Sequence, residues 1–181
     1  STNNVYAESN SNTITANLPG SVAIRLLNAE GTAEISSLDF NNLTPTPQGT
    51  TASKSFIVDV ATSNPTGYKL YMQSDYQDSN HNYTTNLTHT DTDVTDSIPT
   101  STTSGSKVYW NYVNPLTNSG SSNPTPSLIP PYGTPDKIAQ YFSPTNSHQS
   151  TIDINVGIDT TIVSGTYENE LLFSAVGNPT T

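Results

Sequence analysis

Hydrophobic and polar residues alternate with a period of two in one segment of this chain after another. Such alternation places every second side chain on the same face and is typical of β-strands that bury one side. The inward positions that it predicts are Ile14, Ala16 and Leu18; Val22, Ile24 and Leu26; Phe56, Val58 and Val60; Tyr68, Leu70 and Met72; Val108, Trp110 and Tyr112; Ile152, Ile154, Val156 and Ile158; and Tyr167, Leu171 and Phe173. Arg25, Asp59, Asp153, Glu168 and Glu170 fall on the opposite faces.

Turn sequences separate these segments, for example at Pro19 and at Ser164, each of which is followed by glycine. One stretch, residues 134–142, predicts a helix of one or two turns, with Pro135 at its first position. Short strands with one apolar face each and frequent turns favour an all-β fold. We expect an antiparallel two-sheet sandwich of immunoglobulin-like or jelly-roll type.

Two long polar loops interrupt the strands. The first insertion covers residues 74–106, and the second insertion covers residues 114–136 and contains six prolines. Proline cannot donate a ladder hydrogen bond, and loops of this length in a compact domain are usually functional or disordered. We expect both insertions to lie on the surface, where they cover a sheet or contact a neighbour. No repeat or domain boundary is visible, so we expect a leader or donor segment at residues 1–12 and a single sandwich domain at residues 13–181.

The composition narrows the class of protein further. Hydrophobic residues make up 31% and charged residues 11% of the chain, but ten Tyr and four Phe argue against disorder. The formal net charge of −10 repels nucleic acid and anionic membranes, and we expect neither as a partner. No stretch approaches the roughly 20 apolar residues of a membrane helix, so we expect no membrane insertion.

The surroundings of the protein are also suggested by composition. Few Lys and many Ser, Thr and Asn residues suit the surface or extracellular matrix of a bacterium better than a cytoplasm. The chain has no Cys, which is compatible with export because a domain of this size can form a core without disulfides. The abrupt polar start at Ser1 resembles the N-terminus left after removal of a signal peptide, or that of a trimmed chain.

Candidate metal ligands do not form a recognisable site. The acidic cluster D-T-D-V-T-D at residues 91–96 lacks the glycine and the distal glutamate of an EF-hand loop. His81, His89 and His148 are too scattered for zinc, which needs three or four ligands at characteristic spacing. We therefore expect a solvated acidic loop, ordinary histidines and no metal.

Catalytic motifs are equally lacking. No serine lies in a G-x-S-x-G elbow, and there is no phosphate-binding glycine loop or dinucleotide fingerprint. Glu168 and Glu170 share an outward strand face, where they solvate an edge rather than form an acid–base pair. We expect neither a catalytic residue nor a cofactor, and we do not expect an enzyme.

Carbohydrate is the remaining chemistry that the sequence suggests. Three N-x-S/T sequons, at Asn42, Asn82 and Asn86, are candidate glycosylation sites. Tyr76, Tyr83, Tyr109 and Tyr132 are candidates for exposed rings that stack on sugars, although tyrosine also anchors strands and loops. A sugar-binding module would lose its ligand on Trp110→Ala or Tyr132→Ala without unfolding.

The chain resembles a group of bacterial surface proteins. The segment KSFIVDVATSNPTGYKLYM at residues 54–72 has their strand, S/T-N-x-x-G-Y, strand pattern, and residues 152–177 close with G-T-Y-x-N and an alternating strand. The first half, residues 12–60, resembles the opening of matrix-fibre subunits of the TasA and camelysin type. It departs from them at residues 43–49, where L-T-P-T-P-Q-G replaces their L-x-P-G, and the second insertion has no counterpart there.

The resemblance implies a pilus-like homopolymer. In such families the N-terminal segment of one subunit adds to a sheet of the next subunit, and main-chain hydrogen bonds hold the two together. The positions expected at this interface are Val5, Tyr6, Ile14, Ala16 and Leu18. The alternative is a monomeric cell-surface adhesin or glycan-binding module that uses loop aromatics.

Overall fold

The computed structural model of the protein describes residues 4–7, 15–18 and 20–179. Within these residues the chain forms strands and no helix, so the prediction of an all-β protein is confirmed. The strands are β1 (Asn4–Ala7), β2 (Thr15–Leu18), β3 (Gly20–Asn28), β4 (Thr50–Thr62), β5 (Tyr68–Ser74), β6 (Leu87–His89), β7 (Ser97–Ile98), β8 (Tyr109–Val113), β9 (Pro126–Ser127), β10 (Asp136–Tyr141), β11 (Thr145–Ile158), β12 (Tyr167–Glu168) and β13 (Leu171–Gly177).

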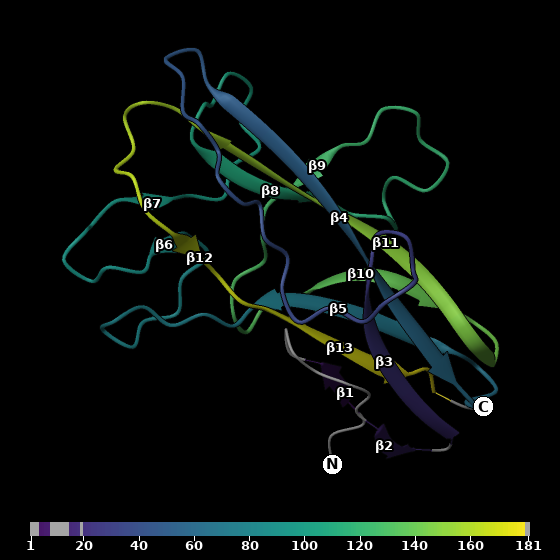
Figure 1. The fold of residues 1–181 in the computed structure, drawn as a ribbon. Coiled ribbons are helices and arrows are strands. Elements are labelled where there is room, and N and C mark those ends of the chain that lie inside the picture. Colours follow the sequence, from purple (N-terminus) through teal and green to yellow (C-terminus); the bar gives the residue numbers. More distant parts are fainter. Residues whose placement is uncertain (1–3, 8–14, 19, 180–181) are drawn as a thin grey trace.

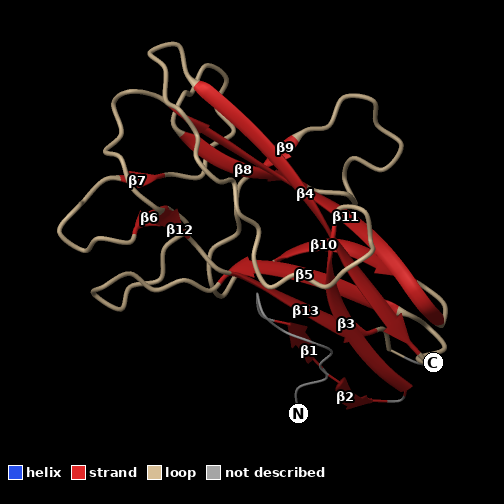
Figure 2. Cartoon of the chain, viewed as in Figure 1, coloured by secondary structure: helices blue, strands red, loops and turns tan. Residues whose placement is uncertain are grey.

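Most strands belong to two antiparallel sheets (Figure 1). Sheet A has the strand order β1-β13-β5-β10, and sheet B has the order β2-β3-β4-β11-β8-β9. The rings of Phe56 on β4 and Phe173 on β13 meet edge to face with their centroids 5.6 Å apart, which brings the two sheets into contact. Figure 2 shows that long loops join the strands and extend beyond the sheets. The chain is thus a two-layered β-sandwich with loops at its ends.

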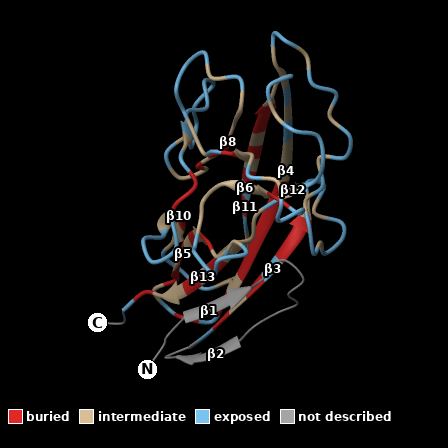
Figure 3. Cartoon of the chain, turned by 90° about the vertical axis from the view of Figure 1, so that its left-hand side faces the viewer, coloured by how far each residue is buried: buried red, intermediate tan, exposed pale blue. Residues whose placement is uncertain are grey.

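The core lies between the two sheets and consists largely of the predicted inward positions. The buried members of that prediction are Val22, Ile24, Leu26, Phe56, Val58, Val60, Tyr68, Leu70, Met72, Trp110, Tyr112, Ile152, Ile154, Val156 and Phe173. Figure 3 shows buried positions along β3, β4 and β11. Burying a side chain of this kind contributes about 1.5–3 kcal/mol, so this shared face is the main stabilising feature of the fold. Ile14 lies outside the described residues.

The outward face of sheet B holds an ion pair between the exposed Arg25 and the buried Asp59. Asp59 lies opposite Arg25 in the ladder between β3 and β4, yet its side chain is only 3% exposed. The Arg25 guanidinium donates to Asp59 Oδ2 at 2.6 Å, and the hydroxyl of Ser147 donates to Oδ1 at 2.6 Å. These bonds replace the water that the carboxylate loses. Asp59 therefore points away from the core, as predicted, but it is not part of a solvated surface.

The predicted helix at residues 134–142 is wrong. Residues 136–141 form β10, which pairs antiparallel with β5, and the pairing shifts register between Lys137 and Ala139. The bulge allows two consecutive side chains, Ile138 and Ala139, to be buried, which produces a pattern that resembles a helix. An isolated helix of so few residues is marginal, whereas the edge of β5 supplies hydrogen-bond partners for the whole segment.

The first insertion is more ordered than predicted. Its β6 and β7 pair with each other and with β12 to form a third, small sheet with the order β12-β6-β7. Ile98 on β7 is 3% exposed and belongs to the main core. The indole N–H of Trp110 donates to the carbonyl of Thr85 at 2.8 Å. The insertion therefore adds Ile98 to the core, while residues such as His81, Asn82 and Asp91 lie on the surface as predicted.

The closing G-T-Y-x-N segment forms two strands and not one. β12 belongs to the small sheet and β13 to sheet A, and Asn169 lies at the break. The Asn169 amide donates to the carbonyls of Thr84 and Asn86 at 3.0 and 2.9 Å, and the Ser74 hydroxyl donates to Asn169 Oδ1 at 2.8 Å. The asparagine thus joins the first insertion to the end of β5. This local role explains its place in the motif.

The tyrosine and the glycine of the same motif also have structural roles. The hydroxyl of Tyr167 donates to the carbonyl of Val163 at 2.6 Å, a bond of the kind that defines the tyrosine corner of immunoglobulin-type sandwiches. The ring of Tyr167 meets His89 edge to face at 4.9 Å. A Cβ on Gly165 would lie 2.0 Å from Nε2 of His89, so only glycine leaves room for this histidine.

The N-x-x-G pattern after β4 ties the end of the described chain to two turns. Asn64 donates through Nδ2 to the carbonyls of Gly67 and Asn178, at 2.8 and 2.9 Å. Asn178 donates in return to the carbonyls of Thr66 and Tyr141, at 2.7 and 3.1 Å. Gly67 has a φ of +79°, and a Cβ there would lie 1.9 Å from the Tyr141 carbonyl oxygen. The turn therefore requires glycine on two independent grounds.

Candidate functional site

The first strand of the chain pairs with the last. β1 forms an antiparallel ladder with β13 in which Val5 lies opposite Ala175 and Tyr6 lies opposite Ser174. β1 is the outermost strand of sheet A, so main-chain hydrogen bonds to one neighbour hold it there. Two of the predicted interface residues, Val5 and Tyr6, therefore lie at a sheet edge, within the segment predicted to be a leader.

The second strand occupies the corresponding edge of sheet B. β2 pairs antiparallel with β3, and Ala16 lies opposite Val22 while Leu18 lies opposite Gly20. Leu18 and Gly20 are separated by a single residue, so β2 is tethered to β3 by a very short turn. β1 also contacts β2 and β3, and the three strands lie together on one side of the sandwich (Figure 1). The N-terminal region thus provides the edge strand of both sheets on that side.

The opposite edges of the two sheets are poor templates for strand pairing. β10 at the edge of sheet A is preceded by Pro135 and contains the bulge between Lys137 and Ala139. β9 at the edge of sheet B is two residues long and begins at Pro126. Proline, bulges and short edge strands all discourage the addition of another strand. The edges at β1 and β2 are the ones on which pairing with another chain can be built.

Among the described residues, no group of three or more His, Cys, Asp or Glu side chains is placed to hold a metal ion. His89 accepts the Asp91 N–H at Nδ1 and contacts the Ser164 carbonyl through Nε2, each at 2.9 Å, so the neutral ring protonated at Nε2 satisfies both bonds. His81 is exposed and has a φ of +64°. The histidines occupy three separate environments.

The acidic cluster at residues 91–96 forms a turn. Asp91 accepts the N–H of Asp93 through its side chain at 3.0 Å and the N–H of Val94 through its carbonyl at 3.0 Å. Asp96 accepts the N–H of Val163 at 2.8 Å. The carboxylates of Asp91 and Asp96 therefore accept hydrogen bonds from backbone N–H groups, as is usual in an ordered surface turn.

His148 lies on β11 of sheet B and contacts two tyrosines of sheet A. Its Nδ1 accepts the hydroxyl of Tyr68 at 2.5 Å, and its ring stacks on Tyr141 with centroids 4.2 Å apart. Burial lowers the pKa of His148, while the charge of Asp59 acts in the opposite direction and is the smaller effect. Burial also raises the pKa of Tyr68, so its hydroxyl remains a donor.

This arrangement predicts a loss of stability in mild acid. The unfolded chain protonates His148 near its ordinary pKa of about 6.5, and the folded protein resists that protonation. The unfolded state then binds more protons, so the free energy of unfolding falls as the pH decreases below about 6.5. We expect urea unfolding at pH 7.5 and 5.5 to show a smaller decrease in the free energy of unfolding for His148→Gln than for the parent.

His81→Asn, at an exposed site whose positive φ suits asparagine, is the control and keeps the parental decrease in the free energy of unfolding. An equal decrease in His148→Gln and the parent contradicts this role of His148.

The candidate glycosylation sites differ in accessibility. Asn42 and Asn82 are exposed. Asn86 is half-buried, and its amide donates to the hydroxyl of Ser97 at 3.1 Å across the small sheet. A glycan on Asn86 would be attached to this half-buried, hydrogen-bonded nitrogen, whereas Asn42 and Asn82 are exposed. Glycosylation itself stays a prediction.

The candidate sugar-stacking residues also separate into two groups. Tyr83 and Tyr132 are 46% and 47% exposed, as predicted. Tyr76 and Tyr109 are half-buried, and the Tyr76 hydroxyl donates to Glu168 at 3.2 Å. Trp110 is 4% exposed and belongs to the core, as its inward position predicted, so it presents no exposed ring on which a sugar could stack.

Comparisons with known proteins give no relative for this chain: no family model, no curated protein and no solved structure matches it. In the part of the chain that the structure describes, no helix is long and apolar enough to cross a membrane. The function therefore has to be argued from the geometry of the sheet edges and loops.

Proposed function

We propose that this protein is a structural subunit of an extracellular bacterial filament, pilus-like or a matrix fibre, assembled head to tail by N-terminal strand addition. The observation that carries the proposal is the position of β1 at the edge of sheet A, paired with β13 alone within that sheet. A strand that pairs along one side only can be supplied by a neighbouring subunit in the same register. The immunoglobulin-like or jelly-roll type of the sandwich remains part of this proposal.

The geometry favours β1 over β2 as the donated strand. β2 is joined to β3 by a very short turn, so it cannot move to another molecule without breaking that hairpin. Seven residues connect Ala7 to Thr15, and a chain of that length spans at most about 25 Å when extended. A contact in which each subunit gives one strand and receives another is heterologous and does not close, so it produces filaments. Of the predicted interface residues, Val5 and Tyr6 belong to this donor, and Ala16 and Leu18 stay with the donor's own sheet.

Deletion of residues 1–12 tests the proposal directly. We expect the full chain to form filaments under negative-stain electron microscopy and the shortened chain to form discrete particles, because the shortened chain has no strand to donate. A synthetic peptide of residues 1–12 should bind the shortened chain and leave it monomeric. Filaments of normal appearance from the shortened chain contradict the proposal.

Engineered disulfides identify the donated strand, and the absence of native cysteines makes the result clear. Residues directly opposite in an antiparallel ladder have Cα atoms about 4.5–5.5 Å apart, which suits a disulfide. In filaments, Tyr6→Cys with Ser174→Cys should give a covalent ladder of oligomers on a non-reducing gel. The control pair Thr15→Cys with Ala23→Cys, in the β2–β3 hairpin, should give cross-linked monomers only. If the double variant forms filaments in which the disulfide between positions 6 and 174 joins residues of the same subunit only, β1 is not the donated strand.

A further inference from the structure

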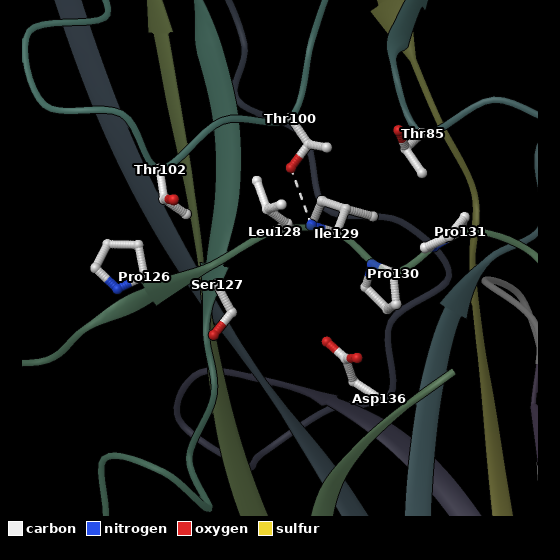
Figure 4. Close-up of a pocket in the computed structure, with 10 residues that line it drawn as sticks. All are labelled: Thr85, Thr100, Thr102, Pro126, Ser127, Leu128, Ile129, Pro130, Pro131 and Asp136. Carbon is white, nitrogen blue, oxygen red and sulfur yellow. Dashed lines mark hydrogen bonds between the residues drawn. The ribbon is translucent and has the colours of Figure 1, made fainter. Parts of the chain in front are cut away.

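The two insertions meet and enclose a groove of about 510 Å³. The N–H of Ser74 donates to the carbonyl of Pro130 at 2.8 Å, and the N–H of Ile129 donates to the Thr100 hydroxyl at 2.9 Å. Figure 4 shows the residues that line the groove: Thr85, Thr100, Thr102, Pro126, Ser127, Leu128, Ile129, Pro130, Pro131 and Asp136. All of them come from the first or the second insertion. The two insertions, which contribute few residues to the two large sheets, therefore form this groove together.

The groove combines hydroxyl groups, apolar patches and one charge. Three threonines and Ser127 supply hydroxyls, and Leu128 is 52% exposed at the rim. Asp136 is the one charged residue in the lining, and its carboxylate points into the groove in Figure 4. The hydroxyl of Tyr112 donates to Asp136 Oδ2 at 2.7 Å and fixes the orientation of the carboxylate. A fixed acceptor beside apolar surface is the usual construction of a site for a polar, uncharged ligand.

A stacked pair of tyrosines joins the same two insertions. Tyr83 precedes the lining residue Thr85 by two positions and Tyr132 directly follows the lining residue Pro131, so both tyrosines belong to the segments that line the groove. The rings stack with centroids 3.8 Å apart and an interplanar angle of 1°, and about half of each side chain is exposed. The pair joins the two insertions and leaves an aromatic face on each outer side. Such faces pack against the C–H surfaces of sugar rings.

We propose that this groove and the Tyr83–Tyr132 pair form a binding site for a neutral glycan. A pyranose ring stacks on an outer tyrosine face, and the next units of the chain lie along the groove with hydroxyls donating to Asp136. The carboxylate and the net charge of −10 repel uronic acids, sulfates and phosphates, so the ligand is uncharged. The proposal does not depend on strand donation.

A peptide is a poorer occupant of the same groove. Peptides that bind in extended form pair their main chain with N–H and C=O groups of a strand. Three of the lining residues, Pro126, Pro130 and Pro131, have no N–H, and the N–H of Ile129 is already bonded to Thr100. The walls therefore offer few main-chain donors, while side-chain hydroxyls and the carboxylate remain for a sugar.

Binding of defined oligosaccharides by the full chain tests the proposal. The probes are the hexaoses of cellulose, starch, laminarin, mannan and chitin, with an alginate hexamer as the anionic control and a proline-rich decapeptide as the peptide control. We expect at least one neutral hexaose to bind in isothermal titration calorimetry and the two controls not to bind. Tyr132→Ala and Asp136→Asn should each weaken that affinity by about tenfold or more, which corresponds to about 1.4 kcal/mol. Phe142→Ala, at an aromatic residue that is 66% exposed outside the groove, should retain it.

Each other outcome overturns the proposal. It fails if no neutral hexaose binds at millimolar concentration, or if the alginate hexamer or the peptide binds as well as the best neutral hexaose. It also fails if Phe142→Ala weakens binding as much as Tyr132→Ala does, since the site then lies elsewhere. Thermal unfolding of every variant shows whether the fold is retained. If Asp136→Asn unfolds through its bond to Tyr112, Tyr132→Ala alone decides the result.

Discussion

Replacing Gly67 with alanine is expected to lower the free energy of unfolding by about 2–4 kcal/mol. The φ of +79° is unfavourable for any residue with a Cβ, which costs about 1 kcal/mol. The added Cβ would also lie 1.9 Å from the carbonyl oxygen of Tyr141 and 2.8 Å from Cα of Phe142. Both obstacles are backbone atoms, so relief requires β10 to move away from the turn, and such overpacking costs about 1–3 kcal/mol more.

The chain supplies a matched control for this substitution. Gly105 has a similar φ of +87°, but a Cβ there would have nothing within 4 Å. Gly105→Ala therefore reports the backbone cost alone, and we expect a loss of about 1 kcal/mol. Urea unfolding followed by circular dichroism measures both variants. Equal losses at the two positions would show that the contact between Gly67 and Tyr141 has no energetic importance.

Trp110→Ala is the second substitution with a large expected effect, a loss of about 3–5 kcal/mol. The indole is 4% exposed, and its removal creates a cavity between the core and the first insertion. The substitution also leaves the carbonyl of Thr85 without the N–H that it accepts at 2.8 Å. Loss of this hydrogen bond adds to the cost of the cavity.

Tyr132→Ala provides the comparison, because Tyr132 is 47% exposed and surface substitutions usually change stability by about 0.5 kcal/mol or less. Trp110 is the single tryptophan, so unfolding must be followed by circular dichroism instead of tryptophan fluorescence. A Trp110→Ala variant as stable as Tyr132→Ala contradicts the placement of the indole in the core. The expected result also means that Trp110→Ala is a poor test of sugar binding, since it changes the stability of the fold.

The positions of the main strands could be predicted from the sequence because burial of one face is a local signal. Val22, Ile24 and Leu26, for example, alternate with residues of the other face, and all three are buried in β3. The same rule predicts the direction of Asp59 but not its burial. Burial depends on Arg25 and Ser147, which come from two other strands.

The parts that sequence reasoning missed depend on contacts between distant segments. β6 and β7 are too short to show alternation, and they exist as strands because they pair with each other and β12. The closing segment reads as one strand because its period of two continues through Asn169, where it leaves one sheet for another. For β10, two adjacent buried residues at a bulge produced the helical pattern. Pairing partners decided the structure in each case.

The groove was missed for a related reason. Tyr83 and Tyr132 were candidates separately, but their stacking brings together two insertions that are remote in sequence. The available signal was the length of both insertions and the proline content of the second, since long loops in compact domains tend to be functional. That signal points to each insertion separately, and it does not predict that the two loops share one surface.

The pairing of β1 with β13 also determines when the protein can fold. Residues 4–7 are synthesised near the beginning of the described chain, and their partners at residues 173–176 near its end. Sheet B can begin as a β2–β3–β4 meander of successive strands, but β1 has no place in sheet A until β13 has been made. Contacts this distant in sequence slow folding, because the intervening chain must be ordered first. The edge of sheet A is therefore among the last parts of the molecule to form, and until it does β1 remains available to other partners.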